Sequence, residues 1–162
     1  MTGRGETADG CGWIEHHPEG IKIRLSRSKT DQDGAGRVIG VVHGERKETC
    51  PVQALLDRLD AAGIVRGPLF RSIHRSGRVQ PDRLNDRSVA LTIKSAAKKA
   101  GLDPTKVSGH SLLSGHATTV AGNDGDERAI QAHLGHHSPE MTRRYIREAN
   151  VFRRSSTGKL GL

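Results

Sequence analysis

The residues best suited to chemistry lie in the C-terminal third of the chain, where histidines and a tyrosine recur at short spacing. His110 opens the run HSLLSGHAT, His136 lies in the run LGHHS, and Tyr145 follows His136 by nine residues. Imidazole groups exchange protons near neutral pH, and a phenol hydroxyl both donates and accepts hydrogen bonds. Tyr145 is the single tyrosine of the chain, and alone it would be interpreted as a half-buried packing residue. The order and closeness of these features favour a shared site instead.

Three short helices are expected to position these side chains. The first covers residues 110–121. The second covers residues 127–134, because Asp126 just before it is a favourable N-cap residue. The third has Pro139 in its first turn and carries Tyr145 within an amphipathic pattern.

An antiparallel β-hairpin is predicted near the N-terminus. Ile21, Ile23 and Leu25 alternate with polar residues, which is the period-2 pattern of a half-buried strand. A second apolar run spans residues 38–42, and the polar, turn-forming residues 29–36 connect the two. This connection is longer and more charged than a tight turn requires, so its tip is a candidate functional element.

Two longer helices follow the hairpin. The first is expected to start at Pro51, with Thr49 as its N-cap, and to end at Gly63. Residues 66–83 are basic and irregular, and the second helix begins near Asp86. The sequence therefore predicts a mostly helical α+β fold, in which a small antiparallel hairpin or sheet packs against about five helices.

The composition favours a polyanionic partner. The chain has 162 residues, and its 26 Lys and Arg outnumber 18 Asp and Glu, which gives a net charge of +8. This balance suits nucleic acid or a membrane surface, and a simply solvated basic face is the alternative. No apolar run approaches the roughly 20 residues that span a bilayer, and no signal-peptide pattern opens the chain. A cytoplasmic protein that does not enter membranes is expected.

The three C-terminal runs resemble the catalytic box of the tyrosine recombinases, or phage integrases. The family pattern is H-x-L-R-x-G-x-A-T, I-Q-x-x-L-G-H and M-T-x-x-Y, and this chain reads HSLLSGHAT, IQAHLGH and MTRRY in the same order. Upstream, RSKTDQDGAGR is similar to the family's β-hairpin, and TCPVQALLDRL is similar to the helix after it. The resemblance covers residues 21–152 and implies the catalytic-domain fold of the family.

The resemblance implies site-specific recombination of double-stranded DNA, by cleavage and rejoining through a phosphotyrosyl intermediate, without a cofactor or metal. In that scheme Tyr145 is the nucleophile, His110 assists proton transfer and holds the phosphate, and His136 hydrogen-bonds a phosphate oxygen. Lys29, delivered by the hairpin, is the general acid for the leaving oxygen. Considered singly, Lys29 would be a solvated turn residue and His136 a helix C-cap.

Two positions depart from the family pattern. Leu113 stands where the pattern has arginine, and leucine neither donates a hydrogen bond nor offsets the charge of a phosphate. The family's other arginine lies in an R-x-x-E-L helix upstream of the hairpin. Arg4 with Glu6 is the candidate relic of that motif, at a spacing one residue short. The sequence therefore predicts an enzyme whose activity is weak or lost.

The expected organisation has three parts. Residues 1–12 are irregular or come from a foreign reading frame, residues 13–152 form the recombinase-like catalytic domain, and residues 153–162 form a basic tail. The family's DNA-clamping domain, which precedes the catalytic domain, has no counterpart in this sequence. We therefore expect a truncated chain that binds DNA weakly and with little sequence choice.

Two other functions stay open. The chain could be a non-catalytic module that binds DNA, or that docks on an intact recombinase or on copies of itself through Val151 and Phe152. It could also be a metal hydrolase that uses His133, His136 and His137, although no Cys or carboxylate accompanies them at a zinc-ligand spacing. DNA binding that weakens with salt is expected both for the recombinase and for the DNA-binding module, and full activity in chelator would exclude the metal hydrolase.

Overall fold

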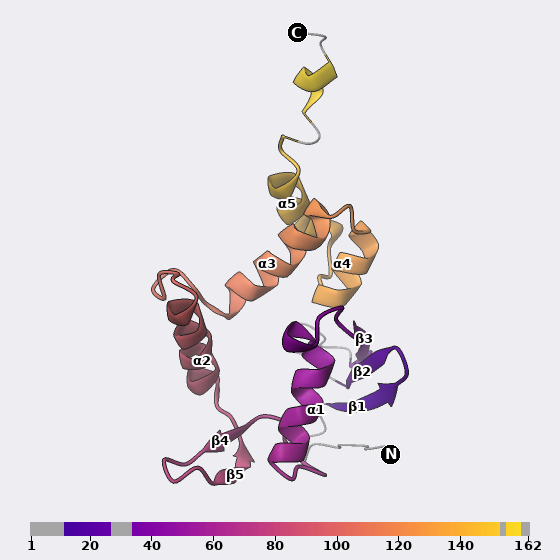
Figure 1. The fold of residues 1–162 in the computed structure, drawn as a ribbon. Coiled ribbons are helices and arrows are strands. Elements are labelled where there is room, and N and C mark those ends of the chain that lie inside the picture. Colours follow the sequence, from indigo (N-terminus) through magenta and orange to yellow (C-terminus); the bar gives the residue numbers. More distant parts are fainter. Residues whose placement is uncertain (1–11, 27–33, 153–154, 160–162) are drawn as a thin grey trace. The chain divides into compact units, whose positions relative to one another are not determined.

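The computed structural model describes residues 12–26, 34–152 and 155–159, and the chain divides into two compact units, Met1–Ser88 and Val89–Leu162 (Figure 1). The elements follow the order β1 (Gly12–His17), β2 (Gly20–Leu25), β3 (Arg37–Val42), η1 (Lys47–Thr49), α1 (Pro51–Ala61), β4 (Arg71–Ile73), β5 (Val79–Arg83), α2 (Asp86–Lys99), α3 (Gly109–Gly122), α4 (Glu127–Leu134), α5 (Pro139–Ala149) and η2 (Ser156–Lys159). The predicted fold class is confirmed, because the described residues form five α-helices and two small antiparallel sheets. No helix within these ranges is both long enough and apolar enough to cross a membrane.

The first unit is built on a three-stranded antiparallel sheet in the order β1-β2-β3. Ile23 of β2 lies opposite Ile14 of β1 and Ile39 of β3, so branched side chains meet across neighbouring strands. Ile21 clusters with Cys50 at the start of α1 and forms part of the buried core of this unit. The predicted hairpin is confirmed as the β2–β3 pair, and β1 adds a third strand to it.

The helix α1 starts at the predicted proline, but its N-cap is Cys50 and the prediction of Thr49 was wrong. The Cys50 sulfur accepts hydrogen bonds from the backbone N–H groups of Gln53, at 3.4 Å, and Gly44, at 3.2 Å. These two donors lower the pKa of the Cys50 thiol from 9.0 to about 7, with Gln53 contributing most. Thr49 instead ends the short 3₁₀ turn η1. Statistical cap preferences favour Thr over Cys, so they pointed one residue too early.

The basic residues 66–83 are not irregular throughout, contrary to the prediction. They contain a second antiparallel pair, β4 with β5, in which Ile73 lies opposite Val79. Polar and basic residues dominate both strands, and Pro81 lies within β5, so neither strand shows the usual pattern. A two-stranded pair leaves one edge of each strand open, which is where a proline is tolerated in a sheet.

The second unit contains the three helices α3, α4 and α5, which lie together in Figure 1 and contact one another pairwise. Its core consists of three buried residues: Ala117, Ala121 and Ile130. The predicted N-cap of α4 is confirmed here. The Asp126 side chain accepts the backbone N–H of Ala129 at 2.8 Å and caps α4. Gly135 ends α4 in the left-handed conformation, with a φ of 68°.

Candidate active site

The second unit brings His110 and Tyr145 into direct contact, although 35 residues separate them along the chain. His110 lies in the first turn of α3 and Tyr145 in the middle of α5. The Tyr145 hydroxyl oxygen lies 2.9 Å from His110 Nε2, which is hydrogen-bond distance. When this nitrogen is unprotonated, the hydroxyl donates to it. The pair therefore has the geometry for passing the tyrosine proton to an imidazole.

Local and tertiary features together fix this pair. Ser108 and Ser111 form a capping box at the start of α3, which sets the direction of the turn that carries His110. The ring of Tyr145 packs against the buried core of the second unit, so its position is determined by helix packing rather than by a loop. Tyr145 is half-buried and His110 is exposed, so the hydroxyl lies where a DNA phosphate could reach it.

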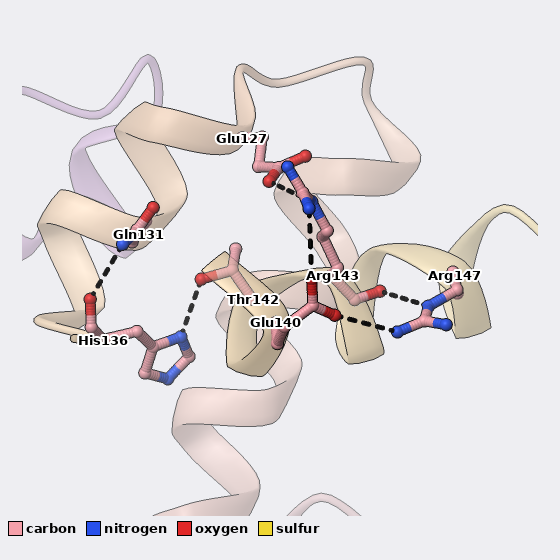
Figure 2. Close-up of polar contacts among 7 residues, drawn as sticks. All are labelled: Glu127, Gln131, His136, Glu140, Thr142, Arg143 and Arg147. Carbon is pink, nitrogen blue, oxygen red and sulfur yellow. Dashed lines mark hydrogen bonds and ion pairs between the residues drawn. The ribbon is translucent and has the colours of Figure 1, made fainter. Parts of the chain in front are cut away.

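The His136 ring lies beside the Tyr145 ring. The two ring centroids are 6.0 Å apart, with an interplanar angle of 20°. Its backbone is held at both ends, because its N–H donates to the Gln131 carbonyl at 3.2 Å and its own carbonyl accepts from Gln131 Nε2 at 3.1 Å. Figure 2 shows how the imidazole then turns toward α5, where Nδ1 lies 2.9 Å from Thr142 Oγ1. The backbone of His136 thus completes the end of α4, while its side chain lies beside the tyrosine.

Thr142 and Gln131 are site residues that the sequence reasoning missed. Thr142 is fully buried, with 0% of its surface exposed, so its hydroxyl needs an internal partner and finds it in His136. Helical spacing could have indicated this, because Thr142 precedes Tyr145 by three residues and shares its helix face. We expect the threonine hydroxyl to donate to Nδ1, which places the ring hydrogen of His136 on Nε2.

If Tyr145 forms a covalent adduct with DNA, as the family resemblance implies, replacing Thr142 by valine should slow adduct formation by about fivefold to tenfold, since one buried hydrogen bond contributes about 1 kcal/mol. The variant Thr142→Ser keeps the hydroxyl and should restore the rate. Nitrogen-15 NMR of His136 gives a readout that simple loss of stability does not move, because it reports which ring nitrogen carries the hydrogen. An unchanged tautomer in Thr142→Val would contradict the positioning role.

The arginine that precedes the tyrosine by two residues is already engaged. Arg143 donates from Nε to Glu127 at 2.8 Å and from a terminal nitrogen to Glu140 at 3.1 Å, as Figure 2 shows. The bond to Glu127 is the main cause of the raised pKa of the Arg143 guanidinium. Arg147 adds a 3.7 Å ion pair to Glu140. Arg143 therefore links α4 to α5, and those donors are not available as a substitute phosphate clamp.

Leu113 lies on α3 three residues after His110, on the same helix face, and it is half-buried. Its side chain has no donor for a phosphate oxygen. Ser114 does not replace it, because its hydroxyl donates to the backbone carbonyl of His110 at 3.1 Å. The site accordingly has imidazole groups beside the tyrosine but no arginine at this position of α3.

The remaining histidines form no metal site in the part of the chain that the structure describes. His116 and His133 stack, with ring centroids 4.4 Å apart and planes 14° from parallel. Stacked rings direct their nitrogen lone pairs outward in parallel planes, so they do not converge on one ion. Within the described ranges no group of three or more His, Cys, Asp or Glu residues could hold a metal.

Several predicted residues cannot be placed against this site. Arg4 and Lys29 lie outside the described residues, as do residues 153–154 and 160–162 of the predicted basic tail. The predicted roles of Arg4 and Lys29 therefore stay predictions. Val151 and Phe152 are described and strongly exposed, at 61% and 91%.

Comparison with known proteins identifies relatives of this chain. A family model described as "Phage integrase family" matches residues 23–151. An "Integrase/recombinase xerD homolog" from Selenomonas ruminantium is 39% identical over 143 residues, which cover 88% of this chain and 42% of that protein. A "Tyrosine recombinase XerC" from Myxococcus xanthus is 35% identical over 124 residues, covering 71% of this chain and 41% of that protein.

A solved structure shares the fold. The crystal structure of XerA recombinase matches with a TM-score of 0.57 at 29% identity, over 83% of this chain and 46% of that one. The chain spans less than half the length of each of these relatives.

Proposed function

The chain belongs to the phage integrase family, and from that premise we propose that it acts in site-specific DNA recombination, with Tyr145 as the nucleophile that cleaves and rejoins a strand. The observation that carries this proposal is the 2.9 Å distance between the Tyr145 hydroxyl and His110 Nε2. A tyrosine held beside an imidazole at this distance has the nucleophile–base arrangement that covalent catalysis requires.

The proposed reaction is a phosphoryl transfer to the tyrosine. The Tyr145 oxygen attacks a phosphodiester, a bond forms between this oxygen and phosphorus, and the bond from phosphorus to the 5′ oxygen breaks. The hydroxyl proton of Tyr145 passes to His110, and the departing 5′ oxygen takes up a proton to become a hydroxyl. A 5′ hydroxyl of another strand later reverses the step. The bond energy is kept in the phosphotyrosyl link, so no nucleotide cofactor is needed.

His136 and Lys29 complete the proposed set. His136 is hydrogen-bonded to Thr142 through Nδ1, and we propose that its Nε2 donates a hydrogen bond to a non-bridging phosphate oxygen as negative charge grows there. Lys29 would supply the proton to the leaving 5′ oxygen, a role that rests on its place in the hairpin sequence. Leu113 removes one cationic donor from the site, and we infer that cleavage is slow in this chain for that reason.

The test is covalent capture on DNA. The chain is incubated with nicked duplexes of randomised sequence, because a nick lets a short product diffuse away and leaves the phosphotyrosyl adduct trapped. We expect a slow, detergent-resistant adduct whose modified peptide contains Tyr145, and no adduct with Tyr145→Phe. Absence of an adduct from both the wild-type chain and Leu113→Arg would contradict strand cleavage.

A second function is favoured by one observation, the exposure of Val151 and Phe152 after α5. Apolar side chains exposed to this degree at the end of a helical unit fit docking on another protein. The chain would then be a non-catalytic module that binds DNA together with an intact recombinase or another copy of itself. Co-purification with such a recombinase, lost in Phe152→Ser, would support this function. A strictly monomeric chain that captures none would count against it.

A further inference from the structure

The basic hairpin β4–β5 has a rigid turn. The His74 N–H donates to the Arg78 carbonyl at 2.9 Å, and the Gly77 N–H donates to the His74 carbonyl at 2.8 Å. Gly77 adopts a φ of 84°, which a side chain would disfavour. The His74 ring also accepts the Ser76 N–H at 3.3 Å. The turn is therefore fixed by its own hydrogen bonds before any ligand arrives.

The arginines of this region are of two kinds. Those at the base of the hairpin are structural: Arg71 donates from Nε to the Pro68 carbonyl at 2.9 Å and from a terminal nitrogen to the Arg66 carbonyl. Arg58 of α1 donates to the Arg71 carbonyl at 3.3 Å. These bonds join the base of the hairpin to its neighbouring segments and leave little freedom for the two guanidinium groups.

The other three arginines of the hairpin, Arg75 and Arg78 near the turn and Arg83 opposite Arg71, are exposed instead. Their side chains make no hydrogen bond or ion pair with any residue that the structure describes. The hairpin has one carboxylate of its own, Asp82, which is also exposed and forms no described ion pair. Elsewhere in the same unit an arginine is neutralised, since Arg24 pairs with Glu15 at 2.7 Å. The hairpin thus concentrates unpaired positive charge on a rigid support.

We propose that this arginine hairpin, residues 71–83, is a DNA-binding site in which Arg75 and Arg78 contact phosphates of duplex DNA. The proposal rests on the proposed function, because it assumes that duplex DNA is the partner. Free guanidinium groups match phosphate geometry and stay charged at any physiological pH. A preformed turn also loses less conformational entropy on binding than a flexible loop does. These contacts would add affinity without reading sequence.

The experiment measures duplex binding by the full chain as a function of salt, with Arg75→Ala/Arg78→Ala against Arg46→Ala/Lys47→Ala. The control pair removes the same charge from exposed residues before α1 in the same unit. Each phosphate contact contributes about 0.9 to the slope of log K against log salt, so the hairpin variant should lose about 1.8 from its slope. Its affinity at low salt should fall by about tenfold. The variant Arg75→Lys/Arg78→Lys keeps the charges and should keep most of the slope.

The outcomes separate this inference from the proposed function. If the wild-type chain binds duplex DNA and the hairpin variant keeps the full slope, the arginine hairpin is not a DNA contact. If both alanine pairs lose equal slope, the effect is one of net charge, and the hairpin has no special part. If the wild-type chain fails to bind duplex DNA but binds anionic vesicles, the premise of DNA as partner is wrong. Thermal unfolding should be unchanged in the hairpin variant, because neither altered side chain makes a described bond.

Discussion

Leu113→Arg should form the covalent DNA adduct about a hundredfold to a thousandfold faster than the wild-type chain, which is the range lost when one oxyanion donor is removed from an enzyme. Leu113 lies three residues after His110 on α3, so an arginine there extends from the same face as the imidazole that contacts Tyr145. A guanidinium group can donate two parallel hydrogen bonds to a phosphate and stabilise its growing charge. Single-turnover rates on the nicked substrate measure the effect.

Two matched variants separate position and geometry from charge. Leu112→Arg adds the same charge at the adjacent residue, which is 59% exposed and points to another helix face, so it should leave the rate almost unchanged. Leu113→Lys places a charge at the correct position without the planar fork of arginine and should recover only part of the gain. Equal acceleration by Leu112→Arg would mean that tighter DNA binding, rather than stabilisation of the transition state, causes the effect.

The second unit could be predicted closely from the sequence because its signals are local. The N-cap Asp126, the left-handed Gly135 and the initial Pro139 each act within one turn of a helix. Helix bounds that depend on such residues do not require knowledge of distant contacts. The predicted bounds of α3 and α4 and the predicted start of α5 therefore agree with the structure to within a few residues.

The first unit was harder because its features depend on pairing between neighbouring segments rather than on single-residue signals. The strand β4 has only three residues, and β5 contains Pro81, so pairing between them gives order that neither sequence pattern shows. Cys50 caps α1 through a sulfur that also accepts from Gly44, six residues earlier. A cap that bridges two segments is not visible in a scale of single-residue preferences.

The candidate site was predictable in its residue types but not in its geometry. The motif order pointed to His110, His136 and Tyr145, and the structure places both imidazoles beside the tyrosine ring. Thr142 escaped notice because a buried hydroxyl acquires its role only when α4 ends where His136 can reach it. Lys29 lies outside the described residues, so its predicted role as the general acid stays a prediction.

Removing the imidazole of His110 should lower the rate of adduct formation by about a hundredfold to ten-thousandfold, the usual contribution of a positioned acid or base. The informative experiment introduces His110→Ala into the Leu113→Arg variant, because the expected rate of that variant is high enough for a large loss to be measured. His110 is exposed, and its backbone carbonyl still accepts from Ser114 in the variant, so the fold should be retained. His116→Ala is the matched control, because this histidine lies on the same helix and stacks on His133 rather than on Tyr145.

The pH dependence of the same variant decides between two roles of His110. If the imidazole accepts the tyrosine proton, the deficit of His110→Ala should shrink at alkaline pH, because hydroxide then removes that proton without help. Added free imidazole should also restore part of the rate in His110→Ala, since it can occupy the space left by the deleted ring. If His110 only holds the phosphate, the deficit should be the same at every pH and should appear largely as weaker substrate binding. A rate in His110→Ala equal to that of His116→Ala would mean that the 2.9 Å contact with Tyr145 takes no part in cleavage.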